Sequence, residues 1–252
     1  MIVFAGPSIA GCAPDRLDGF DLRPPVRQGD VYLASLERPR AIGIIDGYFD
    51  SVPAVWHKEI LWALSLGIPV LGAASMGALR AAELDVFGMI GVGEVYAAYR
   101  DNVLEDDDEV ALLHGPAEVG YPNLTLAMVN LRATLAAAEA EGMLSGPETK
   151  ALIAEGKVIF YHHRTWDSVL AKAPSVRRAS LADWIAAHEV DQKARDADAL
   201  LALMQAGSVL PPAVDFHFEE TGLWQEATQR WQARAPLNDT AGPSRGLSFL
   251  DD

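Results

Sequence analysis

The stretch from Ala41 to Leu84 constrains the fold of this chain more than any other, because two kinds of hydrophobic pattern alternate within it. Residues 41–45 and 69–74 are short, continuous apolar runs, which are typical of strands buried on both faces. Each run is followed by a segment whose apolar residues recur at helical spacing, and the first of these segments stops at Gly67. The order strand, helix, strand, helix predicts that the two strands are parallel in one sheet.

Polar residues follow both strands at the points where the apolar runs end. Asp46 and Gly47 come directly after the first run, and Ser75 follows the second. The carboxyl ends of parallel strands meet at one edge of an open α/β sheet, and ligands bind at that edge. We therefore expect Asp46 and Ser75 to lie at the same rim and to mark a candidate active site.

The rest of the chain is less sharply patterned, but the order of its elements can be predicted. Strands are expected at residues 1–5, 30–35 and 110–113, with a loop or short helix at 13–29. The segment 87–93 is either a loop against the core or a strand that ends at Gly93. Helical spacing is present at residues 94–100, 124–141, 145–156, 180–207 and 219–234.

The character of the chain changes near residue 145, where helical patterns replace the mixture of strands and helices. Ser145 and Glu148 have the spacing of a capping box at the start of the first of these helices. We expect residues 1–145 to form an α/β core, with a mainly parallel sheet flanked by helices. Residues 146–235 are expected to form a smaller helical region, and the polar segment 236–252 a disordered tail.

Charge and hydropathy exclude several classes of partner. The formal net charge of −15 argues against a nucleic-acid backbone or an anionic membrane surface as the main partner. No apolar run approaches the roughly 18–20 residues of a membrane span. The apolar start of the chain has no basic leader and is interpreted as a strand, and Cys12 is the single cysteine. We therefore expect a cytoplasmic protein without disulfides.

The sharpest local motif is Ala73-Ala74-Ser75-Met76-Gly77, which has the small-x-Ser-x-Gly form of a nucleophile elbow. In such a turn between a strand and a helix, small residues let the backbone bend tightly, and the serine hydroxyl stands clear of the sheet. The N–H of Met76, at the start of the helix, would then stabilise an oxyanion. The alternative interpretation is that Ser75 is an ordinary helix N-cap.

A nucleophilic serine needs a base, and two histidines are candidates for that role. His57 follows the loop after the first strand, and His114 lies in a later turn, so both would reach the rim of Ser75 in a parallel sheet. Each is otherwise a packed or surface histidine. Asp46 is either the carboxylate that orients the base, as in a catalytic triad, or a structural cap of the next loop.

Four further residues are candidate substrate contacts. Gly47 is suited to expose backbone N–H groups to a ligand, and Gly77 lets the backbone turn tightly after the serine. Arg80 either holds a carboxylate or thiocarboxylate in a fork of hydrogen bonds or forms a surface salt bridge. Glu59 either pairs with a basic side chain across the helices or faces water.

Metal and nucleotide chemistry are not expected from the sequence. The acidic run from Glu105 to Glu109 lacks the ligand spacing of a defined metal loop and is interpreted as a solvated loop. Gly88, Gly91 and Gly93 do not match the phosphate-binding fingerprint, and no P-loop lysine follows them. We therefore expect neither a bound metal nor a cofactor, and chemistry with ATP is assigned to a partner.

Several blocks of the sequence, in the same order, resemble the TfuA-like family, which is named for a protein of trifolitoxin biosynthesis. The blocks are DGYFDSVPAVWHKEILWAL, GIPVLGAASMGALRAAEL, FGMIGVGEVYAAYRD, LEDDDEVALLHGPAEVGY and MVNLRATL. The resemblance is densest between Ile42 and Leu135, and no functional residue is carried over to the C-terminal part of the chain.

The resemblance implies an accessory protein of peptide or protein backbone thioamidation that works beside a YcaO-type ATP-dependent cyclodehydratase. It also implies a second partner, a small sulfur-carrier protein whose C-terminus is a thiocarboxylate. Together with the motif at Ser75, it predicts that the chain binds the carrier's tail and releases its sulfur by hydrolysis. The attacking group is then Ser75 or an activated water. A non-catalytic adaptor and a generic serine hydrolase are the alternatives, and the oligomeric state stays open.

Overall fold

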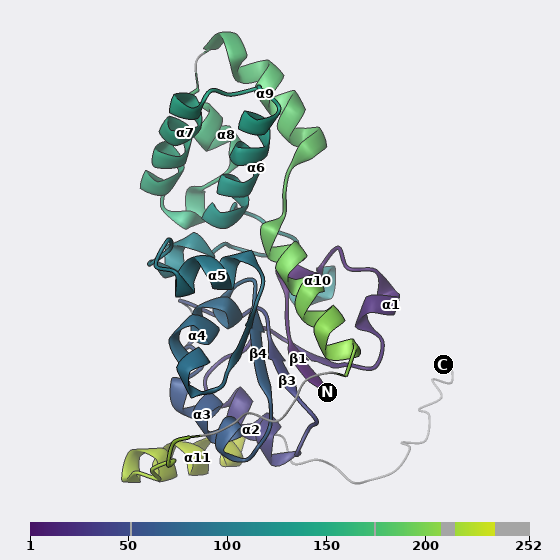
Figure 1. Ribbon diagram of the computed structural model, residues 1–252, viewed down its shortest axis with the longest axis vertical. Helices are drawn as coiled ribbons and strands as arrows, with labels where there is room; N and C mark the ends of the chain where they lie inside the picture. The colour runs from purple at the N-terminus through teal and green to yellow at the C-terminus, as the bar shows by residue number, and fades with distance from the viewer. Residues whose placement is uncertain (51, 174, 208–214, 235–252) are drawn as a thin grey trace, which may run out of the picture. The chain divides into compact units, whose positions relative to one another are not determined.

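Within the residues that the computed structural model describes, which are 1–50, 52–173, 175–207 and 215–234, five short parallel strands form a sheet (Figure 1). The strand order is β2-β1-β3-β4-β5. The strands are β1 (Ile2–Phe4), β2 (Asp21–Arg23), β3 (Ile42–Ile44), β4 (Val70–Ala73) and β5 (Ile90–Val92). All neighbouring pairs are parallel, so the carboxyl ends of the strands meet at one edge of the sheet.

The chain divides into two compact units, Met1–Glu219 and Glu220–Asp252. The first unit contains the sheet and the helices α1 (Pro14–Leu17), α2 (Asp30–Leu36), α3 (His57–Ser65), α4 (Met76–Leu84), α5 (Glu94–Arg100), α6 (Met128–Ala140), α7 (Gly146–Val158), α8 (Trp166–Leu170), α9 (Ser175–His188) and α10 (Gln192–Gln205). Its short 3-10 helices are η1 (Pro7–Ile9), η2 (Asp85–Phe87), η3 (Asp107–Glu109), η4 (Ala117–Val119) and η5 (Tyr161–His163). The second unit contributes α11 (Gly222–Arg234).

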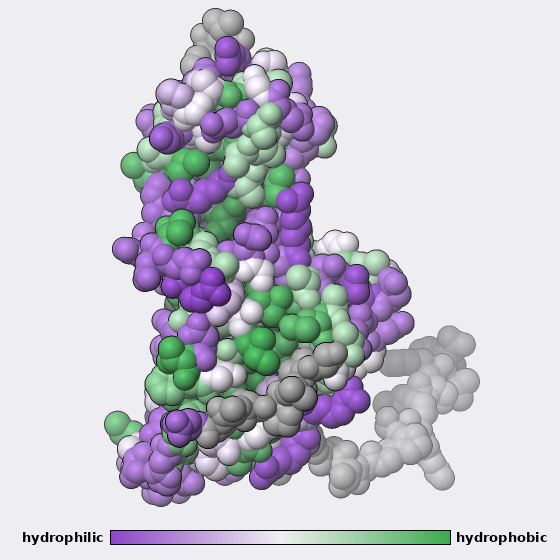
Figure 2. All heavy atoms as spheres, in the orientation of Figure 1, coloured by the Kyte–Doolittle hydropathy of each residue, from purple (hydrophilic) through white to green (hydrophobic). Residues whose placement is uncertain are grey.

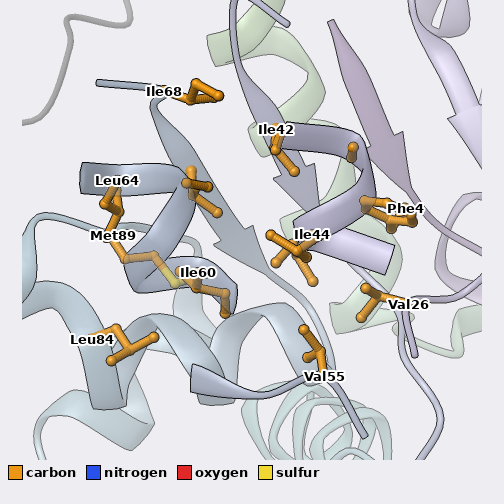
Figure 3. Close-up of a cluster of buried hydrophobic side chains, with 14 of the residues drawn as sticks. Phe4, Val26, Ile42, Ile44, Val55, Ile60, Leu64, Ile68, Leu84 and Met89 are labelled. Carbon is orange, nitrogen blue, oxygen red and sulfur yellow. The ribbon is translucent and has the colours of Figure 1, made fainter. Parts of the chain in front are cut away.

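One face of the sheet is covered by α2, α3 and α4. Ile42 and Ile44 of β3 point to this face and pack in the same buried cluster as Ile60 and Leu64 of α3 (Figure 3). All four side chains are completely buried. Because burying a large aliphatic side chain contributes roughly 1.5–3 kcal/mol, this cluster holds the helical layer firmly against the strands.

The opposite face of the sheet is covered by α10, which is distant from the strands in sequence. Leu200 and Met204 of this helix pack with Val3 of β1. A Cβ at Gly43 of β3 would come within 2.8 Å of the Met204 sulfur, so the helix lies directly on the strand there. The other end of α10 carries Lys193, which reaches the carboxyl edge of the sheet beside Asp46.

The turn from β4 into α4 is built for close packing. Ala74 has a φ of 65°, a left-handed conformation that is uncommon for a residue with a side chain. A Cβ at Gly77 would collide with the carbonyl of Ile44, and one at Gly72 would collide with the carbonyl of Gly77. Because glycine alone fits at these two positions, α4 lies directly on the backbone of the neighbouring strands and fixes the turn at Ser75.

Helices α6 to α9 form a hydrophobic core of their own, distinct from the cores on the two faces of the sheet. Leu131 and Leu135 of α6 pack there with Leu152 of α7 and Ile185 of α9. Figure 1 shows this bundle as a group of its own, from which α10 runs back along the sheet. In Figure 2 hydrophilic residues cover much of the visible surface, in keeping with the net charge of −15. No described helix is long and apolar enough to cross a membrane.

The predicted α/β core is confirmed in its main features. The runs 41–45 and 69–74 contain the parallel neighbours β3 and β4. The segment 87–93 contains β5, so the strand alternative is correct. The capping box at the start of α7 is present, since the Ser145 backbone N–H donates to Glu148 Oε2 at 2.8 Å. The tail expected at 236–252 lies outside the described residues.

Other predictions are corrected by the structure. Residues 30–35 are helical rather than a strand, because Gly29 is left-handed and the buried Glu59 carboxylate accepts from the N–H groups of Gly29 and Tyr32 at the start of α2. Residues 110–113 lie outside the strands, and Leu113 bonds instead to Leu124 and Thr125. The segment 13–29 includes β2, and the periodic stretch 180–207 is broken into α9 and α10 by three residues after His188.

Candidate functional site

The carboxyl edge of the sheet carries a pocket of about 260 Å³. Four of the residues selected from the sequence line it, namely Asp46, Gly47, Ser75 and His114. The expected meeting of Asp46 and Ser75 at one rim is confirmed. The other lining residues are Pro7, Tyr48, Phe49, Asp50, Val110, Ala111, Leu112, Leu113, Tyr161, His162 and Lys193. The pocket is therefore built by the strand-end loops, by the segment 110–114, by η5 and by the start of α10.

Ser75 is held by its backbone, and its hydroxyl is left free. The Ser75 N–H donates to the carbonyl of Ala73 at 2.7 Å, and its carbonyl accepts from the N–H of Leu79 at 3.2 Å. The side chain does not cap α4, and it makes no hydrogen bond to another described residue. Although the residue is only 2% exposed, it lines the pocket. The hydroxyl is thus available to a bound molecule, which the N-cap interpretation would not allow.

Two backbone N–H groups beside Ser75 also lack partners among the described residues. They belong to Gly47 and Met76. The two segments lie against each other, since a Cβ at Gly47 would come within 2.8 Å of the Met76 Cβ. The N–H of Gly77, in contrast, donates to the carbonyl of Ile45 at 3.3 Å. Gly77 therefore serves the packing of α4, while the N–H groups of Gly47 and Met76 remain candidates for oxyanion stabilisation.

Asp46 is buried and organises the turn that follows β1. Its Oδ2 accepts from the backbone N–H groups of Gly6 at 2.9 Å and Ser8 at 3.0 Å. Its Oδ1 accepts from the Ser8 hydroxyl at 2.7 Å. The same Oδ1 lies 3.8 Å from the Nζ of Lys193. Asp46 thus caps the loop that follows β1, and not the loop after Asp46 that the structural alternative named. It also supplies a negative charge to the lysine in the pocket.

Lys193, at the start of α10, is a buried basic group that lines the same pocket as Ser75. Its side chain is 3% exposed, and its Nζ donates to the carbonyl of Val110 at 3.0 Å. Burial lowers the pKa of the amine, an effect that Asp46 and Asp191 partly oppose. A buried amine with a lowered pKa can accept a proton, which is the property that a general base requires.

His114 lies in the pocket, on the segment that follows the acidic run. Its Nδ1 lies 2.8 Å from the carbonyl of Gly115, which can only accept, so Nδ1 carries the proton and Nε2 is free to accept. The ring contacts Tyr48 and Tyr121, with centroid distances of 6.3 and 5.4 Å. His114 thus forms part of an aromatic wall of the pocket.

His57 and Arg80 lie outside the pocket and form a cluster with Glu83. The Nε2 of His57 lies 2.8 Å from Glu83 Oε2, and Arg80 Nη1 donates to the same oxygen at 2.7 Å. The His57 side chain is 48% exposed. The pKa of Glu83 is lowered, because hydrogen bonds and charges from His57 and Arg80 outweigh the opposing effect of burial. For Arg80 the contacts match the salt-bridge alternative.

Glu59 is also outside the pocket, but it is completely buried. Its Oε2 accepts from the N–H groups of Gly29 at 2.8 Å and Tyr32 at 3.4 Å, and its Oε1 accepts from that of Trp56 at 3.1 Å. These contacts tie the start of α2 to the start of α3. Burial raises the pKa of Glu59 to about 7, against the effect of the backbone N–H groups.

The acidic run 105–109 is an ion-pair network and not merely a solvated loop. Asp108 accepts from the completely buried Arg164 at 2.7 Å, and Glu109 accepts from Arg132 and Lys157, each at 2.9 Å. These pairs join the run to α6, α7 and the segment before α8. Among the described residues, no group of three or more His, Cys, Asp or Glu side chains is placed to hold a metal ion.

Sequence reasoning missed Lys193, although a signal was present. Lys193 is four residues before Ala197, and Leu200 and Met204 continue the same buried stripe of α10. A lysine at the head of an apolar helix face is unusual, because isolated charges are rarely buried. The pattern does not predict which strand end the start of this helix lies beside.

Comparison with protein-family models gives a match. The family model described as TfuA-like protein matches residues 46–165, a range that includes Asp46, Ser75 and His114. No curated protein matches the chain. The matched range begins at the end of β3 and ends just before α8. The chain therefore contains a TfuA-like domain, which supports its membership of the TfuA-like family.

Proposed function

We propose that this protein hydrolyses the thiocarboxylated C-terminus of a small sulfur-carrier protein, and that it works beside a YcaO-type enzyme of backbone thioamidation. A TfuA-like domain fits an accessory role in thioamidation. The observation that carries the catalytic part of the proposal is the presence of a free Ser75 hydroxyl and the buried Lys193 amine in one pocket. Ser75 is the nucleophile, and Lys193 is its base.

Lys193 suits the role of base better than either histidine selected from the sequence. His57 lies outside the pocket and pairs with Glu83. His114 lines the pocket, but its ring belongs to the aromatic wall formed with Tyr48. Lys193 is almost completely buried, and burial favours the neutral amine that can take a proton from a serine hydroxyl. His114 is assigned to substrate contact.

In the first step, the Ser75 oxygen attacks the thioacyl carbon of the carrier's C-terminus, and a C–O bond forms. The hydroxyl proton passes to the Lys193 amine. The negative charge that develops on the acyl oxygen is stabilised by the N–H groups of Gly47 and Met76, which have no partner among the described residues. The C–S bond then breaks, and Lys193 returns the proton to the departing sulfur, which leaves as hydrosulfide.

In the second step, water hydrolyses the ester between the carrier and Ser75. Lys193 takes a proton from the water as its oxygen forms a bond to the acyl carbon, and then returns a proton to the serine oxygen as the ester C–O bond breaks. The products are the carrier carboxylate, a proton that is released to the solvent, and free Ser75. The net reaction is hydrolysis of a thiocarboxylate, and it consumes no oxidant or reductant. The released sulfide is the sulfur supplied to the partner enzyme.

The shape of the pocket suits a slender substrate. Its volume is about 260 Å³, and its wall includes the rings of Tyr48, Phe49 and Tyr161. A flexible C-terminal tail without bulky side chains can enter such a space, whereas a folded surface cannot. The acidic character of the whole chain, with a net charge of −15, favours a carrier with a basic surface around its tail.

The test is to incubate the purified protein with a thiocarboxylated carrier and to measure sulfide. We expect release by the wild type and a loss of many orders of magnitude in Ser75→Ala, because a nucleophile cannot be replaced by a methyl group. The variant should fold normally, since the hydroxyl makes no hydrogen bond to a described residue. Sulfide release by Ser75→Ala at the wild-type rate would remove the serine mechanism, and a variant that still supports thioamidation would favour an adaptor.

A further inference from the structure

The backbone around Lys193 is hydrogen-bonded to side chains on one face of α6. The Lys193 N–H donates to Asn130 Oδ1 at 3.2 Å, and Asn130 Nδ2 donates to Asp191 Oδ1 at 3.0 Å. That same carboxylate oxygen caps α10, because it accepts from the N–H of Ala194 at 2.9 Å. Asn130 therefore binds both the lysine backbone and the residue that starts its helix.

One turn further along α6, Thr134 forms hydrogen bonds with Val190, the residue before Asp191. Its hydroxyl oxygen accepts from the N–H of Val190 at 3.0 Å, and the hydroxyl lies 3.4 Å from the Val190 carbonyl. Asn130 and Thr134 are four residues apart and so lie on the same side of the helix. The segment 190–193 is thus fixed to α6 at both of its ends.

The far end of the Lys193 side chain is fixed separately. Its Nζ donates to the carbonyl of Val110. Glu109, the residue before Val110, forms ion pairs with Arg132 of α6 and Lys157 of α7. The backbone and the amine of Lys193 are therefore both anchored to elements that contact α6, through Asn130 at one end and through the acidic run at the other.

We propose that Asn130 is a positioning residue for the Lys193 amine, which it aims at Ser75 by fixing the lysine backbone and the start of α10. This rests on the proposed function. Asn130 is 4% exposed and does not line the pocket that contains Ser75, although it lines a separate pocket together with Asp191. It is therefore not a direct contact of the substrate at Ser75. An amide is suited to the task, because it accepts from the Lys193 N–H and donates to Asp191 at the same time. An aliphatic residue would do neither.

The charged groups around Lys193 determine how a substitution at position 130 would change the protonation of its amine. Asp191 belongs to the turn before α10, and Asp46 approaches from the end of β3. The other titratable residues of the pocket are Tyr48, Asp50, His114, Tyr161 and His162. A new carboxylate at position 130 would add negative charge beside Asp191 and would favour the protonated, inactive amine.

The experiment compares Asn130→Ala, Asn130→Asp and the double variant Asn130→Asp/Asp191→Asn for sulfide release from a thiocarboxylated carrier. In Asn130→Ala we expect kcat to fall by about a hundredfold with KM unchanged, because a misplaced base loses rate and not substrate binding. In Asn130→Asp we expect the rising limb of the pH–rate profile to move to higher pH.

The double variant is the decisive one, because it exchanges the two side chains and keeps the net charge. The carboxylate at position 130 still accepts from the Lys193 N–H, and the amide at position 191 now donates to it while its oxygen still caps Ala194. We expect both kcat and the pH profile to return to within about threefold of the wild type. A purely structural role for Asn130 would lower the melting temperature of Asn130→Ala but leave the kcat of its folded fraction at the wild-type value.

Thr149→Val is the matched control, since Thr149 is buried in α7 and its hydroxyl has no partner among the described residues. It should leave kcat unchanged. If Lys193→Met keeps full activity, the proposed base is wrong and the function itself must be revised. If Lys193→Met is inactive but Asn130→Ala keeps the wild-type kcat and pH profile, the positioning role is overturned alone. If Asn130→Ala fails to fold, Asn130→Asp and the double variant decide.

Discussion

Lys193 and Glu59 are both buried ionisable side chains, but their surroundings differ in a way that separates a reactive group from a structural one. Burial shifts the pKa of each toward the neutral form. Glu59 is bonded to three backbone N–H groups and does not line the pocket at the carboxyl edge of the sheet. Lys193 bonds to one carbonyl and lines the pocket that contains the free Ser75 hydroxyl. Burial alone therefore does not mark a catalytic group, whereas burial beside a pocket with an available partner does.

The largest effect is expected when the lysine is replaced by an uncharged residue of similar length. Lys193→Met should lower sulfide release by about 10²- to 10⁴-fold, which is the usual contribution of a general base. It should also lower the free energy of unfolding, by up to about 3–5 kcal/mol, because the buried Asp46 carboxylate loses the positive partner that lies 3.8 Å away. Steady-state sulfide assays and urea unfolding check the two parts. Full activity in Lys193→Met would show that Lys193, like Glu59, has a structural role and not a catalytic one.

The converse result is expected for Glu59→Ala, which should affect stability and spare the chemistry. Three backbone N–H groups lose their acceptor, and an unsatisfied buried donor costs about 1–3 kcal/mol. We expect the free energy of unfolding to fall by about 3 kcal/mol or more. The folded fraction should still release sulfide at the wild-type rate, as measured below the unfolding transition. A stable variant with impaired kcat would contradict the division between the two groups.

The pH dependence of stability sharpens the same comparison. The pKa of Glu59 is raised from 4.5 to about 7, so between these values the folded state keeps a proton that the unfolded state has lost. Stability should therefore fall as the pH rises through this window, by at most about 3 kcal/mol. Glu83 and Glu109, whose pKa values are lowered, act in the opposite sense and below pH 4.5.

Urea unfolding at several pH values between 4.5 and 7 measures this slope. The control is Glu59→Gln, which keeps an acceptor at the site but cannot titrate, and which should remove most of the slope. An unchanged slope in Glu59→Gln would show that another group is responsible.

The sequence was sufficient for those parts of the site that depend on local pattern. The runs 41–45 and 69–74 read as buried strands because their apolar residues are continuous, and the connecting helix makes such strands parallel. Asp46 and Ser75 then follow at one edge. The glycine-containing motif after β4 likewise predicted a tight turn, and the structure shows why Gly72 and Gly77 have no side chain.

The rest of the site depends on contacts between distant parts of the chain. In the sequence, Lys193 is separated from Ser75 by a stretch that includes all of α6 to α9. No local pattern indicates that α10, which follows this stretch, packs against the sheet. Glu59 was expected to pair with a basic group or to face water, but its role depends on the backbone of Gly29, thirty residues earlier. The strand expected at 30–35 was wrong for the same reason, since the carboxylate that supports the start of α2 comes from α3.

The smallest effect is expected at His57, and it tests whether the pocket has been placed correctly. His57 pairs with Glu83 at 2.8 Å, and both side chains are well exposed, at 48% and 38%. Exposed pairs of this kind contribute about 1 kcal/mol or less, and salt weakens them. His57→Ala should therefore leave sulfide release unchanged and lower the melting temperature only slightly.

His114→Ala is the matched comparison, because it removes a histidine that does line the pocket, and a raised KM is expected for this variant. Loss of activity in His57→Ala, with His114→Ala unaffected, would move the reaction away from the carboxyl edge of the sheet and toward the α3–α4 surface.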